Sequence, residues 1–428
     1  MSADEKFDAI VVGAGPAGSA CAYVLAREGK SVLLVERGVS AGSKNVTGGR
    51  LYTYALEMVE PGLYERAPLE RKVVREQIMI LGTNNAITID YTDYDFGENI
   101  PQSYTVLRAP FDEWFAGEAE AQGAMLATGI LVDELLEENG KIVGIKAGED
   151  ELYSDIVIAA DGVNSLIAQQ AGLRNQDINP HTVNVGLKEI IELPQEIIEA
   201  RFNLKNNEGA ARLGLGGTEG IPGGMFLYTN QSSISLGMVL NPQQVAQHGR
   251  KAQELLQDLK LHPAIYPLIE GGTTVEYGAH LVPEIGLEAM PSKLSRDGLL
   301  IVGDAAGFGI NTGTIIRGID LAIVSGLAAA NAVIKASRPE QAGSLYMQEL
   351  EDLLLLPTMK VFARWHHILD IPRMYKEYPK AAIDSMKLMF KVDGKVPPKI
   401  TKAMYNVVTK DVSLGQLISD TWKGFRSI

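Results

Sequence analysis

Residues 7–37 read FDAIVVGAGPAGSACAYVLAREGKSVLLVER, and this stretch decides the fold. The apolar run Phe7–Val12 predicts a strand buried on both faces, as in a parallel sheet. A glycine-rich turn and a helix predicted over 16–28 follow, and a second strand is predicted over 31–35. The pattern therefore predicts the strand, turn, helix and strand unit from which parallel α/β sheets are built.

The turn between the first strand and the helix carries three glycines at the spacing GxGxxG. The first glycine permits the tight turn, the second lets backbone approach a pyrophosphate, and the third lets the helix pack closely on the strand. Amides at the helix N-terminus would face the phosphates. The spacing therefore predicts a bound dinucleotide. The residues predicted to bind its phosphates are Val12, Gly13, Ala14, Gly15, Pro16, Ala17 and Gly18.

An acidic residue ends the second predicted strand. Glu36 stands eighteen residues beyond Gly18, about where a carboxylate would accept hydrogen bonds from adenosine ribose hydroxyls, and Arg37 follows it. A second negative group in the ribose pocket would repel this carboxylate, which argues against an adenosine 2′-phosphate. The predicted ligand is FAD or NAD rather than NADP. The alternative is a glycine-rich turn in an α/β protein that binds no dinucleotide.

The composition is that of a globular protein large enough for two or three domains. The chain has 428 residues, of which 46% are hydrophobic and 21% charged, with a formal net charge of −14. This negative charge disfavours nucleic acid as a partner. We expect no signal peptide, because the first strand begins at Phe7, and no apolar run reaches the roughly eighteen residues of a spanning helix. We therefore expect a soluble, cytoplasmic protein, with any membrane contact confined to the membrane surface.

Cys21 is the single cysteine of the sequence and lies in the first predicted helix. One thiol cannot form an intrachain disulfide, a zinc site or an iron–sulfur cluster, so any cluster is expected on another polypeptide. The sequence predicts no metal site in this chain. The histidines interpreted as surface or packed residues, without metal-ligand spacing, are His181, His248, His262 and His280.

Two further segments could contact the ligand. The loop after the second strand includes Thr47, Gly48, Gly49 and Arg50. Adjacent glycines there would let backbone pass close to a flat ring, and a flexible loop is the alternative. Arg108 stands between a short strand and a helix, where it could reach a phosphate or ribityl oxygen or lie solvated at the surface. The residues alone leave both choices open.

Two later turns also follow predicted strands. Asp161 lies in an Asp-Gly turn that could be no more than a turn. Gly303 and Asp304 follow a strongly apolar strand. The carboxylate of Asp304 could accept a hydrogen bond from a sugar-alcohol hydroxyl, or it could cap a helix.

The order of patterns predicts an α/β fold, α+β overall, in four segments. Parallel-sheet patterns over 1–172 and 285–344 predict one domain in two parts. Alternating, glycine-rich segments over 173–284 predict an inserted, mostly antiparallel substrate domain, to which 73–104 could also contribute. Residues 345–428 read as a helical C-terminal segment.

Helices are also predicted over 242–261 and from near residue 314. In the C-terminal segment, apolar stripes that include Trp365, Met386 and Phe390 lie among basic residues. Such stripes either face the core or form a docking surface for a partner or for lipid headgroups at the inner face of the cell membrane.

Three motifs together resemble those of a known family. In chain order they read GAGPAG (13–18), VIAADGVNS (157–165) and LIVGDAAGFGINTG (300–313). They resemble the glutathione-reductase-type FAD proteins, with an FAD-binding Rossmann domain. More narrowly, SKNVTGGRL (43–51) and residues 314–326 resemble the electron-transfer-flavoprotein:quinone oxidoreductases, in particular the bacterial Fix-type flavoprotein subunit. The resemblance covers nearly the whole chain.

The resemblance implies a bound FAD and a role for each motif. The three glycines would hold the pyrophosphate and Glu36 the adenosine ribose. Arg108 would lie near the cofactor, Asp161 would close the back of the site, and Asp304 would hold the ribityl chain, with Gly303 also in the cofactor site. The residues implied to border the isoalloxazine are Thr47, Gly48, Gly49, Arg50, Thr312, Gly313 and Thr314.

The same resemblance implies an FAD-dependent oxidoreductase that passes electrons from an electron-transfer flavoprotein to a quinone, directly or through a small ferredoxin-like iron–sulfur protein. The family's larger members carry a cysteine-bearing ferredoxin-like domain, which this sequence with its single cysteine does not contain. The flavin would perform the redox chemistry, so no catalytic acid–base pair is expected. NAD(P)H-dependent monooxygenases and polyprenyl reductases of the geranylgeranyl type share the architecture and are alternatives, as is a non-catalytic, FAD-stabilised docking subunit.

Overall fold

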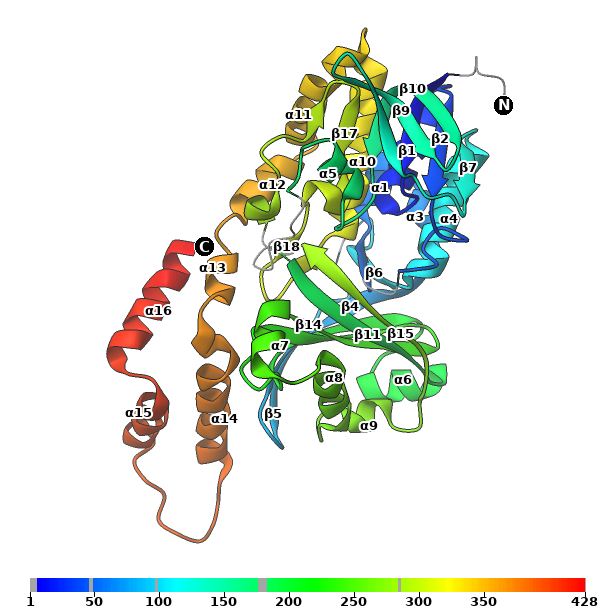
Figure 1. The fold of residues 1–428 in the computed structure, drawn as a ribbon. Helices are drawn as coiled ribbons and strands as arrows, with labels where there is room; N and C mark the ends of the chain where they lie inside the picture. The colour runs from blue at the N-terminus through cyan, green and yellow to red at the C-terminus, as the bar shows by residue number, and fades with distance from the viewer. Residues whose placement is uncertain (1–5, 46–48, 97–98, 176–182, 284–285, 428) are drawn as a thin grey trace.

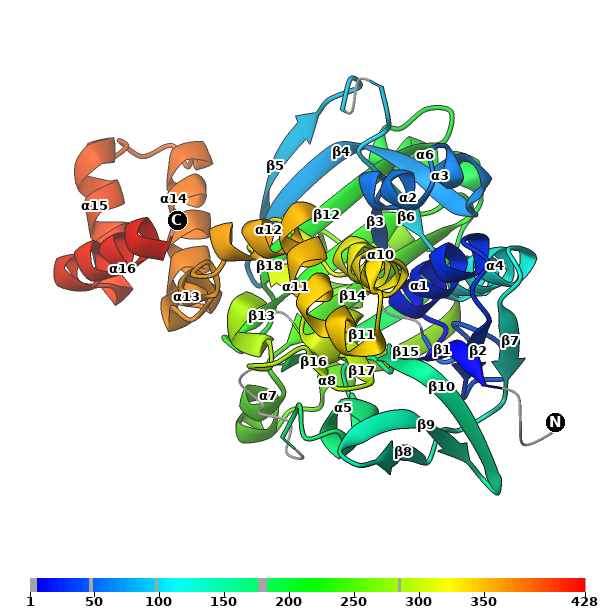
Figure 2. The same cartoon turned by 90° about the horizontal axis from the view of Figure 1, so that it is seen from above.

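The computed structural model describes residues 6–45, 49–96, 99–175, 183–283 and 286–427. Figure 1 shows a body of two β-sheets with helices on their faces, and a group of C-terminal helices that projects from one side. Figure 2 shows the same helices to one side of the body when it is seen from above. The chain therefore has a mixed α/β body and a helical C-terminal segment.

The first sheet is mainly parallel, and several of its strands end together at one edge. Its strands are β1 (Phe7–Val12), β2 (Val32–Glu36), β7 (Met125–Thr128), β10 (Asp150–Ala159), β16 (Ser295–Arg296) and β17 (Leu299–Ile301), with β9 (Lys141–Ala147) paired to β10 and β8 (Glu134–Glu138) paired to β9. The order is β16-β17-β10-β1-β2-β7. The Cα register pairs Val12 with Ala159 and Val35, and Ala159 also with Ile301. The turns after β1, β10 and β17 therefore meet at the carboxyl edge of the sheet.

Helices rich in small residues cover this sheet. They are α1 (Pro16–Arg27), α4 (Arg108–Ala121), α10 (Ile319–Lys335) and α11 (Ala342–Asp352). Helix α1 packs against both α4 and α10. The α1–α10 contact is so close that a Cβ on Gly326 would lie 2.1 Å from the carbonyl oxygen of Ala17. Apolar burial between sheet and helices supplies most of the stabilisation of this layer.

The second sheet is mostly antiparallel. Its strands are β3 (Arg50–Tyr52), β4 (Leu69–Leu81), β5 (Ala86–Thr92), β6 (Ser103–Val106), β11 (Val183–Glu192), β12 (Glu208–Gly216), β13 (Gly223–Thr229), β14 (Ser233–Leu240) and β15 (Thr273–Pro283). The order is β15-β11-β14-β13-β12-β4-β6-β3, with β5 beside β4, and β12 and β4 run parallel.

The two faces of the second sheet have different surroundings. Leu227, Leu236 and Met238 belong to an apolar core with residues of α6 (Gln195–Phe202), α8 (Ala252–Leu261) and α9 (Tyr266–Ile269), which cover one face in Figure 1. Because side chains alternate along a strand, Phe226 and Tyr228 on β13 point to the other face. That face is turned towards the first sheet.

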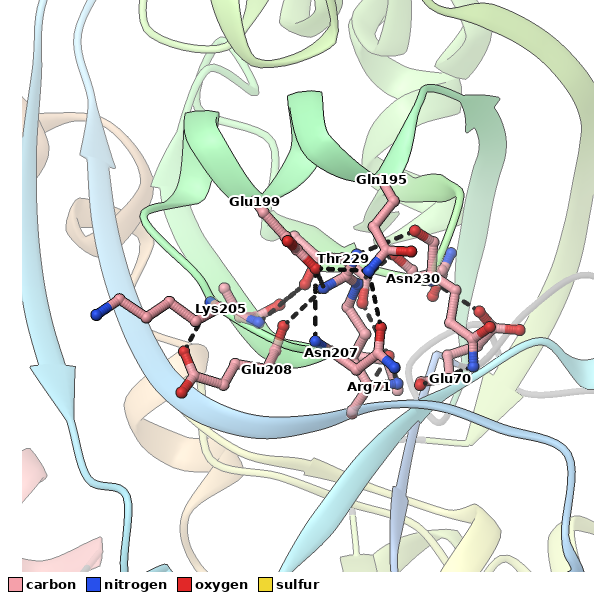
Figure 3. Close-up of polar contacts among 12 residues, drawn as sticks. Glu70, Arg71, Gln195, Glu199, Lys205, Asn207, Glu208, Thr229 and Asn230 are labelled. Carbon is pink, nitrogen blue, oxygen red and sulfur yellow. Dashed lines mark hydrogen bonds and ion pairs between the residues drawn. The ribbon is translucent and has the colours of Figure 1, made fainter.

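A buried arginine ties β4 to its neighbours (Figure 3). The side chain of Arg71 on β4 is fully buried. Its Nε donates to the carbonyl oxygen of Asn230 at 2.6 Å, and Nη2 donates to that of Gln231 at 3.0 Å. Nη1 donates to the carbonyl oxygen of Glu208 and to the carboxylate of Glu199, both at 3.1 Å. The guanidinium therefore joins β4 to α6, β12 and the β13–β14 turn.

The C-terminal helices are α12 (Leu355–Val361), α13 (His366–Leu369), α14 (Glu377–Phe390), α15 (Ile400–Asp411) and α16 (Leu414–Ser427). Arg373 donates to both carboxylate oxygens of Asp420, at 2.6 and 2.7 Å, and Tyr378 donates to the same carboxylate. These bonds hold the start of α14 against α16. Among the residues that the structure describes, no helix combines the length and the apolar character needed to cross a membrane.

Two of the predicted helices differ in the structure, and a glycine explains each difference. The single helix predicted over 242–261 is wrong, because Gly249, at φ +77°, ends α7 (Pro242–His248) before α8 begins. The helix predicted from near residue 314 begins instead at Ile319. A short hairpin of β18 (Ile310–Asn311) and β19 (Ile316–Arg317) precedes it, with Gly313 at φ +81° in its turn.

Candidate cofactor site

The carboxyl edge of the first sheet and the inner face of the second enclose a cavity of about 380 Å³. Three turns from distant parts of the chain meet at it, because β1, β10 and β17 are neighbours in register. The residues predicted from the sequence that line this cavity are Val12, Gly13, Gly15, Pro16, Ala17, Glu36, Arg37, Gly49, Arg50, Arg108, Asp161, Gly303 and Asp304.

The β1–α1 turn can be formed only with glycine at two positions. Gly13 has φ +107°, and a Cβ there would lie 2.3 Å from the carbonyl oxygen of Ala160. A Cβ on Gly18 would lie 1.9 Å from the carbonyl oxygen of Gly13. In contrast, a Cβ on Gly15 would meet nothing within 4 Å, so the space beside this cavity-lining residue is open. This is the shape expected of a turn that lets a phosphate approach backbone.

Glu36 connects the end of β2 to the same turn. Its Oε2 accepts a hydrogen bond from the amide of Ala14 at 3.1 Å, and its Oε1 accepts one from the amide of Gly38 at 2.6 Å. Ala14 and Gly18 are buried behind the cavity wall and shape the turn. The carboxylate is therefore held at the cavity with its orientation fixed by two amides.

Asp161 presents an unsatisfied oxygen at the cavity. Its Oδ2 accepts the amide of Ile167 at 2.9 Å, whereas Oδ1 is buried and has no hydrogen-bond partner among the described groups. Burial raises the pKa of Asp161 to about 6. A buried acceptor without a donor is costly, so Oδ1 fits a site that a donor-bearing group completes. The geometry therefore agrees with a cofactor that carries hydroxyl or amide donors.

Arg108 and Asp112 form an ion pair in the first turn of α4. Arg108 Nε lies 3.0 Å from Asp112 Oδ1, and Nη2 lies 2.8 Å from Oδ2. Burial raises the pKa of the Asp112 carboxyl, and the facing guanidinium partly offsets this. Burial also raises the pKa of Asp304, against the opposing effect of Arg108. Asp112 also lines the cavity, although it was not predicted as a site residue from the sequence. Its spacing of four residues from Arg108 on a predicted helix could have indicated the ion pair.

The second sheet supplies the opposite wall, which contains several residues that the sequence did not indicate. The rings of Phe226 and Tyr228 stack with centroids 5.5 Å apart. Gly49 packs against Tyr228, because a Cβ on this glycine would lie 2.4 Å from the ring. His280 on β15, interpreted from the sequence as a surface or packed residue, also lines the cavity. Burial and the positive charge of Arg108 lower the pKa of His280.

A network of arginines and tyrosines borders the start of α10. Arg317 Nε donates to Asp320 at 2.8 Å and Nη2 donates to the hydroxyl of Tyr54 at 2.7 Å, which in turn donates to Asp320 at 3.0 Å. The guanidinium of Arg50 lies 4.8 Å from the ring centroid of Tyr52, within range of a cation–π contact. Arg50 and Arg317 both line the cavity. The network fixes the N-terminus of α10 beside it.

Some predicted residues do not line this cavity. Thr312, Gly313 and Thr314 lie in the β18–β19 hairpin, and Gly313 lines a separate, smaller cavity of about 110 Å³. Thr47 and Gly48 lie outside the described residues. Contacts of these five residues with a flavin ring therefore stay predictions.

The comparisons with known proteins agree on the family. Residues 6–201 match the model of an FAD binding domain, and residues 365–428 match the ETF-QO/FixC family C-terminal domain. Protein FixC of Escherichia coli O157:H7 is 45% identical over 426 residues, which cover 98% of this chain and 99% of the relative. The "Probable electron transfer flavoprotein-quinone oxidoreductase YdiS" of Escherichia coli K12 is 46% identical over 428 residues, with 98% and 99% covered.

Solved structures of lower identity share the fold. A geranylgeranyl bacteriochlorophyll reductase-like protein from Thermoplasma acidophilum gives a TM-score of 0.69 at 22% identity and covers 97% of this chain and 99% of its own. The probable FAD-dependent monooxygenase pqsL from Pseudomonas aeruginosa gives 0.63 at 15% identity, with 89% and 100% covered. The near-full-length relatives and the FAD-binding domain decide the assignment: this chain belongs to the ETF-QO/FixC family of FAD-dependent oxidoreductases.

Proposed function

We propose that this chain uses FAD to pass electrons from an electron-transfer flavoprotein to a quinone, directly or through a small ferredoxin-like iron–sulfur protein. The observation that carries the proposal is one cavity at which the glycine turn after β1 meets the turns of Asp161 and Asp304, in a chain closely similar to a relative named for this activity. When bound, FAD would supply the redox chemistry. The side chains around it would bind it, orient it and exclude water, and no acid–base pair is required of them.

We propose that each wall of the cavity binds a different part of FAD. The turn at Gly13 and Gly15 would receive the pyrophosphate, supported by the N-terminus of α1. Glu36 would accept the adenosine ribose hydroxyls, and the free oxygen of Asp161 would accept a further donor. Asp304, with Arg108, would hold the ribityl and phosphate portion.

The isoalloxazine is proposed to lie between the two sheets. Gly49, Arg50 and Tyr228 form the wall that would border its ring system, together with the N-terminus of α10. The hairpin residues Thr312–Thr314 and the loop residues Thr47 and Gly48 remain part of the proposed border. Replacing Tyr228 would be expected to alter the flavin spectrum, because the polarity around the ring would change.

The proposal also assigns the domain boundaries and the type of FAD-binding fold. Residues 1–172 and 285–344 would form a glutathione-reductase-type FAD domain, supported by the parallel order of its sheet and the GxGxxG turn. Residues 173–284, with strands from the 73–104 region, would form the substrate domain, supported by the antiparallel sheet that includes β4, β5 and β11. Residues 345–428 would form the helical segment.

The iron–sulfur centre is proposed to reside on a partner. The one cysteine of the sequence, Cys21, is fully buried in α1, and burial raises the pKa of its thiol. A buried, protonated thiol is a poor metal ligand. Electrons that leave the flavin for a cluster would therefore pass to a ferredoxin-like protein.

A peripheral membrane position is also proposed, with the rest of the chain in the cytoplasm. The segment 365–428 contains eleven lysines and arginines against six acidic residues, a net charge of +5 in a chain of −14. Large apolar side chains on the same helices are exposed, among them Phe390 (78%), Trp422 (64%) and Phe425 (79%). Exposed apolar side chains among lysines are suited to the anionic headgroups of a membrane surface.

The function is tested by reconstitution. Purified protein with its FAD, mixed with the reduced electron-transfer flavoprotein, should show reduction of its flavin, and a soluble quinone should reoxidise it. Rapid bleaching by NAD(P)H alone would favour a monooxygenase or polyprenyl reductase instead. A flavin that cannot be reduced reversibly even with all partners present would favour a docking subunit. Colourless protein that does not take up FAD would refute all three.

A further inference from the structure

Two histidines and a glutamate converge where the C-terminal helices join the body. His366 and His367 begin α13, and Glu288 lies in a short 3-10 helix (Gly286–Ala289) after β15. One potential ligand atom from each side chain lies within 4.8 Å of the others. Nε2 of His366 is 3.2 Å from Oε1 of Glu288, and the two imidazole centroids are 4.0 Å apart. Three side chains able to bind a cation thus meet from two distant segments.

The bonding of His366 within the protein is incomplete. Its side chain is buried, with a relative exposure of 9%, and its Nδ1 has no hydrogen-bond partner among the described groups. The ring also lines the smaller cavity of about 110 Å³. Buried ring nitrogens are normally paired, because desolvation of an unpaired one is not compensated. Nε2, the ring nitrogen that faces Glu288, is therefore the atom that a cation at this cluster would engage, and Nδ1 would carry the ring proton.

We propose that Glu288, His366 and His367 bind a divalent cation, with Zn²⁺ as the best match. Two imidazoles and one carboxylate form an N, N, O ligand set that Zn²⁺ accepts readily, whereas Mg²⁺ and Ca²⁺ prefer oxygen ligands alone. The side chains of Glu288 and His367 are 58% and 41% exposed, so water can complete the coordination. The competing interpretation is an ion pair between Glu288 and His366 with no metal.

The position of the cluster suggests what the cation would do. His366 and His367 lie at the start of the segment 365–428 that matches the family's C-terminal domain, and Glu288 belongs to the body. A cation shared by both would fasten α13 to the body at the root of the projecting helices. Sequence spacing shows only the adjacent histidines, because the third ligand arrives through the tertiary structure.

The test uses FAD-loaded protein without a histidine tag, freed of metals by dialysis against a chelator and then titrated with ZnSO₄ in a calorimeter. We expect one Zn²⁺ bound per chain. The variants His366→Gln and Glu288→Gln should each bind it at least roughly tenfold more weakly, since loss of even an outer-shell partner costs about 10–100-fold. Titration with MgCl₂ should give no comparable binding.

Matched controls keep the result interpretable. His248 on α7 lies 3.8 Å from Glu219 at the surface and is not part of the Glu288, His366 and His367 cluster, so His248→Gln should leave zinc binding unchanged. Circular dichroism and the flavin spectrum would show that each variant is folded. The proposal is overturned if the unmodified protein binds no Zn²⁺ at micromolar concentrations, or if His366→Gln and Glu288→Gln bind it as tightly as the unmodified protein does.

Discussion

At the residue scale, Gly13 is the position where we expect a substitution to affect cofactor binding most directly. It combines φ +107° with a position in which a Cβ would lie 2.3 Å from the carbonyl oxygen of Ala160. Alanine there must displace the turn that meets β10, so we expect Gly13→Ala protein to be isolated with little or no FAD. The measurement is flavin absorbance per mole of protein after gel filtration.

Gly29 provides the matched control for this substitution. Gly29 also has a positive φ, +78°, but a Cβ there would meet nothing within 4 Å. Gly29→Ala should therefore retain FAD and lose only about 1 kcal/mol of stability from the unfavourable backbone conformation. A full complement of FAD in Gly13→Ala would contradict the role given to this turn.

The carboxyl of Asp161 should make the stability of the FAD-free protein depend on pH. Burial raises its pKa from 3.8 to about 6, so the folded state binds a proton more tightly than the unfolded state does. Stability from this group is present below about pH 4 and is lost as pH rises to about 6, by about 3 kcal/mol at most. Asp161→Asn should flatten this part of the profile of Tm against pH. Identical profiles for the two proteins would contradict the assignment.

At the scale of elements, Arg71 is the side chain that holds β4, α6 and β12 together. Arg71→Ala removes the donor to three carbonyl oxygens and to Glu199. We expect the free energy of unfolding to fall by about 3 kcal/mol or more, because buried acceptors lose their partner. The measurement is urea unfolding followed by circular dichroism.

Arg250 is the control for this prediction, since its three ion pairs, with Glu219, Glu254 and Asp258, are solvent-accessible. Arg250→Ala should leave the free energy of unfolding nearly unchanged, because solvent screens these exposed ion pairs. Equal losses in Arg71→Ala and Arg250→Ala would show that the buried network is not what stabilises the second sheet.

At the scale of the whole molecule, charge and apolar surface are distributed unevenly. Because the C-terminal helices are basic, we expect the protein to co-sediment with vesicles that contain phosphatidylglycerol but not with vesicles of phosphatidylcholine alone. Added salt should weaken this binding. The double variant Trp422→Ser, Phe425→Ser should bind less. Tyr94→Ser is the control, because Tyr94 is similarly exposed (62%) but lies on the body. Binding that is equal on neutral vesicles, or unaffected by the double variant, would contradict membrane contact through these helices.

The sequence predicted best those elements whose interacting residues are close together along the chain. The strand Phe7–Val12 has the predicted bounds, and the helix that follows ends at Arg27, close to the predicted end. These elements depend on neighbouring residues, on the glycine spacing and on an apolar run. The helix over 242–261 failed because one glycine in a left-handed conformation ended it, and a helical pattern by itself does not show which glycine adopts that conformation.

The sequence by itself determined the GxGxxG turn, the acid at the end of the second strand and the two aspartate turns, because each is encoded within a few consecutive residues. Only the tertiary structure decided that Tyr228 and His280 form the wall opposite these turns, and that Glu288 meets His366 and His367. Strand pairing and helix docking bring these side chains together from distant positions. Apolar burial and strand register across the whole fold determine which of these contacts form. The spacing of residues within one segment does not indicate them.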